Sequence, residues 1–185
     1  MKVLKFGGTS VGTVESLRNV KSIVEGQEEP VIVVVSALGG ITDQLINTAR
    51  LAAQGDISYL DNYARIVERH HQVIEGIVPQ ALQLDLLSMV NPLLEELGNI
   101  YRGISLIKDL SDRTLDIVVS YGERLSSVII SKIIDGAIHL DSRNFIKTEK
   151  QWNKHVLDND TTQRLVHGIF DDLKYDAVSY THLRA

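Results

Sequence analysis

The stretch Lys2-Val-Leu-Lys-Phe-Gly-Gly-Thr-Ser10 decides the fold, because its character changes abruptly half-way along. Val3–Phe6 suits a short β-strand, and two glycines and two hydroxyl residues follow at once. Glycines permit a sharp turn or a close approach of the backbone to another group. The stretch therefore predicts a strand, a turn and then a helix, with Thr9 or Ser10 as the helix N-cap.

The segments that follow extend this strand into a βαβ unit. Apolar residues at helical spacing predict a helix over Val14–Glu25. Val31–Ser36 is apolar on both faces, which is typical of a central strand in a parallel sheet covered by helices on each side. We expect the crossover between the two strands to be right-handed, as it is in nearly all such units.

The middle of the chain has the pattern of successive helices. After a second glycine turn at Gly39-Gly40, the spacing predicts a helix over Ile41–Ala53. The region from Ile57 to Ile107 is rich in helix. We expect breaks in it at Gly76–Pro79 and at Asn91-Pro92, because glycine and proline interrupt helices.

The last third completes the domain. A helix over Thr114–Ile134 is expected to end at a cap provided by Gly136. The remaining predicted elements are a strand over Ala137–Leu140, an edge strand over Trp152–Leu157, a helix over Thr161–Leu173 and a final strand from Asp176 to Tyr180. Together the elements indicate one layered α/β domain, with a helical hairpin inserted at about residues 57–107.

Composition excludes several classes of function. The chain has 185 residues, 44% of them hydrophobic and 23% charged, as in a soluble globular domain. Its net charge of −5 leaves no basic surplus for nucleic-acid phosphates. The longest apolar run, Val31–Leu38, is far shorter than the ~20 residues that span a bilayer. We therefore expect a cytoplasmic protein with neither a nucleic-acid nor a membrane partner.

Metal binding by the protein itself is not expected. The chain has no cysteine, and its six histidines lack the spacing of a zinc site. His70 and His71 lie in a polar helical stretch, which favours a solvated helix face.

Polar residues follow three of the predicted strands, at Lys5–Ser10, Ser36–Thr42 and Asp141–Arg143. Ligands of open α/β sheets gather at the carboxyl ends of the strands. A lysine beside exposed backbone N–H groups, ahead of a helix, suits an oxyanion such as phosphate. The spacing matches neither the Walker loop nor the dinucleotide fingerprint, so a solvated lysine before an ordinary glycine turn is an equal alternative.

The second cluster and a polar stretch at 120–126 each allow two interpretations. Gly39-Gly40, after Ser36, indicates either a close backbone approach or a plain βα connection. Thr42 suits a helix N-cap, a role compatible with ligand contact. Glu123 lies among apolar residues, and a buried carboxylate needs a cationic partner such as a ligand ammonium or Lys5. The alternative for Glu123 is a surface ion pair with Arg124 or Arg113, worth roughly 1 kcal/mol or less.

Three blocks of sequence together resemble aspartokinase. They are KFGGTSV at residues 5–11, VVVSALGGITDQL at residues 33–45 and VSYGERLSS at residues 119–127. Their order and separation also match, and the resemblance runs from Met1 to about Tyr175. The stretch GISLIKDLSDRT at residues 103–114 is similar to the form of the enzyme that is fused to homoserine dehydrogenase.

The resemblance implies a fold, a reaction and a set of site residues. The fold would be the amino-acid kinase fold, a three-layer αβα sandwich with a mostly parallel sheet. The reaction would transfer the γ-phosphoryl group of ATP, with Mg²⁺, to the β-carboxylate of L-aspartate, the first step towards lysine, threonine and methionine. Lys5 would be catalytic, and Glu123 would face the α-ammonium group of aspartate. The phosphates would be lined by Lys5, Gly7, Gly8, Thr9 and Ser10, and aspartate would be held by Ser36, Thr42 and Glu123.

The end of the chain departs from the family pattern. In the family a second half follows, which binds adenine and ribose and carries an arginine for the substrate α-carboxylate. Here residues 1–178 resemble the N-terminal part of the kinase domain, and residues 179–185 are atypical. We therefore expect little or no kinase activity from this chain alone, and a homo-oligomer only for a full-length protein. The alternatives are another enzyme of this fold, acting on acetylglutamate, glutamate or uridylate, and a non-catalytic binding module.

Overall fold

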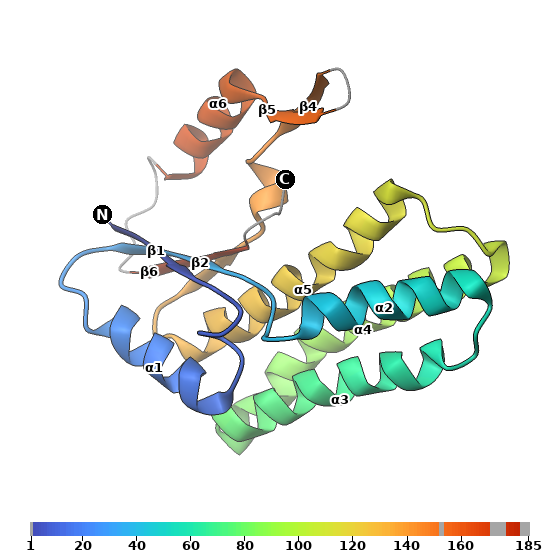
Figure 1. Ribbon diagram of the computed structural model, residues 1–185. Helices are drawn as coiled ribbons and strands as arrows, with labels where there is room; N and C mark the ends of the chain where they lie inside the picture. Colours follow the sequence, from blue (N-terminus) through green and yellow to red (C-terminus); the bar gives the residue numbers. More distant parts are fainter. Residues whose placement is uncertain (1, 152–153, 171–176, 182–185) are drawn as a thin grey trace.

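A parallel four-stranded sheet forms the centre of the molecule (Figure 1). The computed structural model describes residues 2–151, 154–170 and 177–181. The sheet has the order β1-β2-β6-β3, and its strands are β1 (Lys2–Phe6), β2 (Val31–Val35), β6 (Ala177–Thr181) and β3 (Ile138–Leu140). Phe6 is level with Val35 in the β1–β2 register, so the loops after these two strands begin side by side.

Helices cover both faces of this sheet, and strand β2 shows the division. Val31, Val33 and Val35 are buried in a core that includes residues of α1 (Val14–Glu25), α2 (Ile41–Gln54) and α5 (Asp112–Ile133). The alternate residues Ile32 and Val34 pack with Phe145 and with apolar residues of α6 (Asn159–Phe170). The predicted three-layer αβα arrangement with a parallel sheet is therefore confirmed.

The inserted hairpin consists of α3 (Tyr59–Ile77) and α4 (Gln80–Ile107), which pack against each other and against α2 (Figure 1). The break expected at Gly76–Pro79 is confirmed, but the break expected at Asn91-Pro92 is wrong. Helix α4 continues through Pro92, whose ring is exposed. Burial of one apolar face of α4 along its length stabilises the helix by more than the loss of one backbone hydrogen bond costs.

Several caps differ from the sequence prediction. Thr13, rather than Thr9 or Ser10, caps α1, and its capping box with Ser16 has both hydrogen bonds, of 2.9 and 3.0 Å. The amides of Ser10 and Val11 instead donate within the loop, to the carbonyls of Gly7 and Gly8.

Helix α2 is capped by Gly40 with φ of +81°, so Thr42 lies inside the first turn instead of at the cap. Helix α5 ends at Ile133 with Ile134 extended, and Gly136, expected to be its cap, forms the turn into β3 with φ of +71°.

The edge strand expected over Trp152–Leu157 does not join the main sheet. Strands β4 (Thr148–Gln151) and β5 (Lys154–Leu157) instead pair with each other, antiparallel, after a short helical turn η1 (Ser142–Asn144). Trp152, Asn153 and residues 171–176 lie outside the described residues. The final strand is present as β6 and runs past Val178 to Thr181, between β2 and β3.

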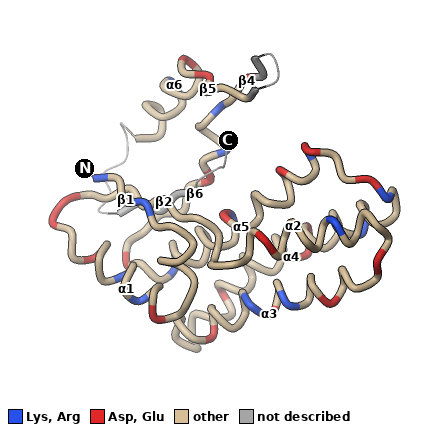
Figure 2. Tube along the Cα trace, in the orientation of Figure 1, with Lys and Arg blue, Asp and Glu red and all other residues tan. Residues whose placement is uncertain are grey.

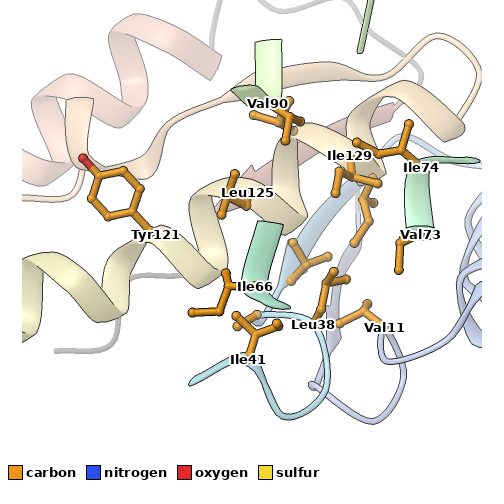
Figure 3. Packing of buried hydrophobic residues seen from close by; sticks show 14 of the residues in the cluster. Val11, Leu38, Ile41, Ile66, Val73, Ile74, Val90, Tyr121, Leu125 and Ile129 are labelled. Carbon is orange, nitrogen blue, oxygen red and sulfur yellow. The ribbon is translucent and has the colours of Figure 1, made fainter. Parts of the chain in front are cut away.

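The main core fills the space between the sheet and the helices α1 to α5 (Figure 3). His70 is part of this core, so the solvated face expected for it is wrong. It lies on the apolar stripe of α3 with Ile66, Val73 and Ile74, and its Nδ1 lies 2.7 Å from the Ile66 carbonyl oxygen. Burial lowers the pKa of His70 to about 4. His71 is half-buried, and its Nε2 lies 2.8 Å from Asn91 Oδ1.

Charges of both signs are interspersed along the helices (Figure 2). Throughout the described part of the chain, each helix is either too short or too polar to cross a membrane.

Candidate active site

The loops that follow β1 and β2 touch through their glycines. A β-carbon at Gly39 would lie 3.0 Å from the Gly8 carbonyl oxygen and 3.2 Å from the Gly12 α-carbon. One at Gly12 would lie 3.1 Å from the same Gly8 oxygen. Such contacts are tighter than a β-carbon normally makes, so a side chain at either position would push the backbone of the two loops apart by a few tenths of an ångström. Gly39 therefore makes a close backbone approach, and the group that it approaches is the loop after β1.

Helix α5 packs against the second loop at a glycine of its own. A β-carbon at Gly122 would lie 2.6 Å from the Ala37 β-carbon, so only glycine allows this approach. Four residues on, the buried Ser126 hydroxyl donates to the Ser36 carbonyl oxygen at 2.8 Å. These two contacts bring the 119–127 block against the 33–45 block. All three blocks of the sequence therefore meet at the carboxyl ends of β1 and β2.

The end of β1 and the loop after it present a cation and an open glycine to solvent. Lys5 is exposed at the end of β1, where its backbone pairs with β2, and its ammonium group makes no hydrogen bond or ion pair with any residue that the structure describes. Gly7 and Thr9 are also exposed, and Ser10 is half-buried. The space beside Gly7 is open, because a β-carbon there would meet no atom within 4 Å. A free cation beside an open glycine turn can bind an anion.

The three predicted aspartate-binding residues surround the second loop. The Ser36 amide donates to the Phe6 carbonyl oxygen at 3.0 Å, which joins the ends of the two strands. Thr42 is half-buried in the first turn of α2. Glu123 is 8% exposed on α5, one residue from the Gly122 contact. Burial to this degree excludes the solvent-exposed ion pair considered for Glu123.

Arg124, one of the two arginines considered as a partner for Glu123, has contacts on α4 and α5. Its guanidinium lies 3.4 Å from Glu96 and 4.2 Å from the centre of the Tyr121 ring. Tyr121 also donates to Glu96, at 3.0 Å. Burial raises the pKa of Tyr121, so its hydroxyl remains protonated.

The third polar cluster, Asp141–Arg143, lies further along the sheet, but its charges interact with α5. It follows β3, which is separated from β2 by β6. Burial disfavours the ionised Asp141 carboxyl, but hydrogen bonds from Arg143 outweigh this and hold the pKa of Asp141 below its usual value. Arg124 of α5 also contributes to the lowered pKa of Asp141, so this cluster is electrostatically coupled to the 119–127 block.

The sequence predicted no role for Gly12, and it placed Ser126 in a polar stretch without a role of its own. Gly12 was a third glycine ahead of the first helix, and Ser126 a hydroxyl on the apolar side of α5. Each had a local signal, but only the fold shows that these residues bring the loops together.

The overall pattern of the sequence can be compared with that of known proteins. The model of the amino acid kinase family matches residues 1–169. The chain belongs to this family. Among solved structures, Escherichia coli aspartokinase III in complex with aspartate and ADP superposes on 97% of the chain with a TM-score of 0.83, at 22% identity. The amino-acid kinase fold implied by the resemblance is thus confirmed.

Curated relatives of this amino acid kinase chain include aspartokinases. Aspartokinase 1, chloroplastic, of Arabidopsis thaliana is 29% identical over 94% of the chain, and the match covers 31% of the relative. The bifunctional aspartokinase/homoserine dehydrogenase of Buchnera aphidicola is 32% identical over 72% of the chain, which is 17% of that relative. The chain covers 40% of E. coli aspartokinase III. It therefore spans about a third or less of the length of these curated relatives.

Proposed function

We propose that the chain carries the phosphate and aspartate half of an aspartate kinase site. The observation that carries this proposal is the meeting of its three blocks at the ends of β1 and β2. A cation lies at the end of β1, an open glycine begins the first loop, and a buried carboxylate lies on α5 beside the second loop. Aspartokinases are among the relatives, and the E. coli enzyme was solved with aspartate and ADP.

The first loop would hold the transferring phosphoryl group. Lys5 would neutralise charge that develops on its oxygens, while backbone N–H groups at Gly7 and Gly8 and the hydroxyls of Thr9 and Ser10 would orient it. Mg²⁺ would enter with ATP as part of that substrate. Phosphoryl transfer depends mainly on positioning and charge neutralisation, which are what this loop offers.

The second loop and α5 would hold L-aspartate. The carboxylate of Glu123 would pair with the α-ammonium group, and Ser36 and Thr42 would supply polar contacts. The β-carboxylate of aspartate is ionised at neutral pH, so it can attack phosphorus without a general base. The site therefore needs no residue to remove a proton from the acceptor.

The remaining features of the enzyme are part of the same proposal. We infer a division into residues 1–178, with the insertion at 57–107, and an atypical tail at 179–185. The longer protein would be a cytoplasmic homo-oligomer, with a homoserine dehydrogenase domain fused to the kinase. It would catalyse the first step in the synthesis of lysine, threonine and methionine. The 185-residue chain would have little kinase activity by itself, because the part of the relatives beyond it is large.

Calorimetric titration of the purified chain with L-aspartate tests the proposal. We expect binding by the wild type and a loss of at least about tenfold in affinity for Glu123→Gln, because the ion pair with the ammonium is removed. Glu75→Gln, at an exposed position on α3, is the matched control and should bind like the wild type.

Equal aspartate affinity in the wild type and Glu123→Gln would contradict the assignment of Glu123. A folded wild-type chain that binds neither aspartate nor Mg·ATP would contradict the half-site as a whole. Vigorous aspartate-dependent release of ADP would contradict the expectation that the chain has little activity alone.

A further inference from the structure

One side chain of the helical hairpin reaches the loop after β1. The Arg69 guanidinium, on α3, donates a hydrogen bond to the Gly12 carbonyl oxygen. Gly12 is buried, and it is the residue just before the Thr13 cap of α1. The same glycine packs against Gly8 and Gly39. The carbonyl that Arg69 binds therefore belongs to the residue where both glycine loops and the start of α1 come together.

Helix α1 contacts the same face of α3 at Gly76, about two helical turns after Arg69. Val14 lies so close to Gly76 that a β-carbon at Gly76 would be 2.7 Å from its Cγ2. Arg18 also donates to the Gly76 carbonyl oxygen at 3.2 Å. Helix α3 is thus joined to α1 at Gly76 and to the loop before α1 at Arg69.

Helix α3, which carries Arg69, is held in place by contacts on two sides. On one side it buries Ile66 and Ile74 in the core cluster that also contains Val11 of the first loop (Figure 3). On another side the Tyr63 hydroxyl donates to the Leu94 carbonyl oxygen of α4 at 2.7 Å. Arg69 therefore projects from a helix fixed by its neighbours towards a loop with several glycines.

We propose that Arg69 is a positioning residue that holds the 7–13 loop in its anion-binding shape. It fixes the Gly12 carbonyl, and with it the turn in which Ser10 and Val11 donate to Gly7 and Gly8. The helical hairpin thereby becomes a structural support of the phosphate site. The identity of the anion as a phosphate rests on the function proposed above. The hydrogen bond by which Arg69 positions the loop is independent of that function.

The test uses the whole 185-residue chain and four variants. Arg69→Met removes the donor, Arg69→Gln shortens it, and Arg69→Lys keeps the charge and one donor group. Arg65→Met is the matched control, because Arg65 is exposed one turn earlier on α3. The measurements are amide hydrogen exchange at Ser10 and Val11 by NMR, and calorimetric titration with inorganic pyrophosphate and with L-aspartate.

We expect exchange at Ser10 and Val11 to become about tenfold faster in Arg69→Met, and the affinity for pyrophosphate to fall about tenfold. Arg69→Lys should recover part of both effects, and Arg65→Met should match the wild type. The affinity for aspartate should be the same in all folded variants, which a general loss of structure would not allow. Wild-type exchange and pyrophosphate affinity in Arg69→Met would overturn the proposal.

Two outcomes separate this proposal from the function itself. If the folded wild type binds no pyrophosphate, the proposed function fails, and exchange alone decides the role of Arg69: faster exchange in Arg69→Met supports it, and unchanged exchange overturns it. If circular dichroism shows that Arg69→Met does not fold, Arg69→Gln is judged by the same criteria.

Discussion

The glycine loops and the helical hairpin are stabilised in opposite ways. The loops after β1 and β2 fit together because Gly8, Gly12 and Gly39 have no side chains. The hairpin is held by large apolar residues, among them Leu97 and Tyr101, which have no exposed surface. Added atoms should therefore damage the loops, as they would at the two hairpin glycines that touch Val14 and Tyr63, and removed atoms should damage the apolar core of the hairpin. The shape of the site is therefore set by close backbone contacts, and the hairpin that supports it is stabilised by side-chain packing.

The largest effect should come from removing atoms from the hairpin. Leu97→Ala should lower the free energy of unfolding by roughly 3 to 5 kcal/mol, because it removes apolar contacts and leaves a cavity. Urea denaturation followed by circular dichroism measures this difference. A loss below about 1 kcal/mol would show that the hairpin is loosely packed, and the comparison with the loops would break down.

Acid should weaken the hairpin through His70. The pKa of histidine is ordinarily 6.5, and burial lowers that of His70 to about 4 in the folded chain. Between these two pH values the unfolded chain binds a proton that the folded chain does not. The stability contributed by the neutral ring is fully present above pH 6.5 and is lost as the pH falls through 4, by up to about 3 kcal/mol. Urea denaturation from pH 7 to pH 4 should show a slope that His70→Gln reduces and the control His71→Gln does not. An unchanged slope in His70→Gln would assign the acid sensitivity to other groups.

Adding one methyl group should have opposite effects on stability at Gly122 and at Gly103. Gly122→Ala, where α5 meets the second loop, should destabilise by roughly 2 kcal/mol and weaken aspartate binding, because the new atom meets Ala37. Gly103→Ala, in α4, meets no atom within 4 Å and should stabilise by up to about 1 kcal/mol. Thermal and urea denaturation of both variants measure the pair. If both variants changed stability in the same direction, the contact of Gly122 with Ala37 would not be what requires glycine at that position.

The smallest effect should come from the helix cap beside the loops. Thr13→Ala should cost about 1 kcal/mol, because it removes a capping box, whereas the exposed Thr9→Ala should leave stability nearly unchanged. Urea denaturation distinguishes the two. The reverse result would move the start of α1 towards the position expected from the sequence.

Much of the fold could be predicted because local patterns agreed with the final packing. The strands at residues 2–6, 31–35 and 138–140 and most helices follow from apolar periodicity. Prediction failed where tertiary contacts decided the result. Pro92 lies inside α4 because the helix buries its other face, and His70 is buried because it shares the stripe of Ile66.

The candidate site was predictable in its parts but not in its assembly. Lys5, the glycines and Glu123 had signals in their spacing and surroundings. The contact of Gly12 with Gly39 and the hydrogen bond from Ser126 to Ser36 join residues far apart in the chain. No local rule predicts such pairs, because each depends on the alignment of β1 with β2 and on the position of α5. The roles of the site residues remain predictions.

The position of β6 affects how the protein is made. This strand is synthesised after every other described element, yet it lies between β2 and β3, and β3 pairs with it. On the ribosome, β1, β2 and the helical hairpin can assemble while the place beside β2 is still open. Closing it pairs Val31 with Ala177, which lie far apart in the sequence, so we expect this step to be slow and the edge of β2 to stay unpaired until β6 is made. A nascent chain at this stage would be a natural substrate for chaperones.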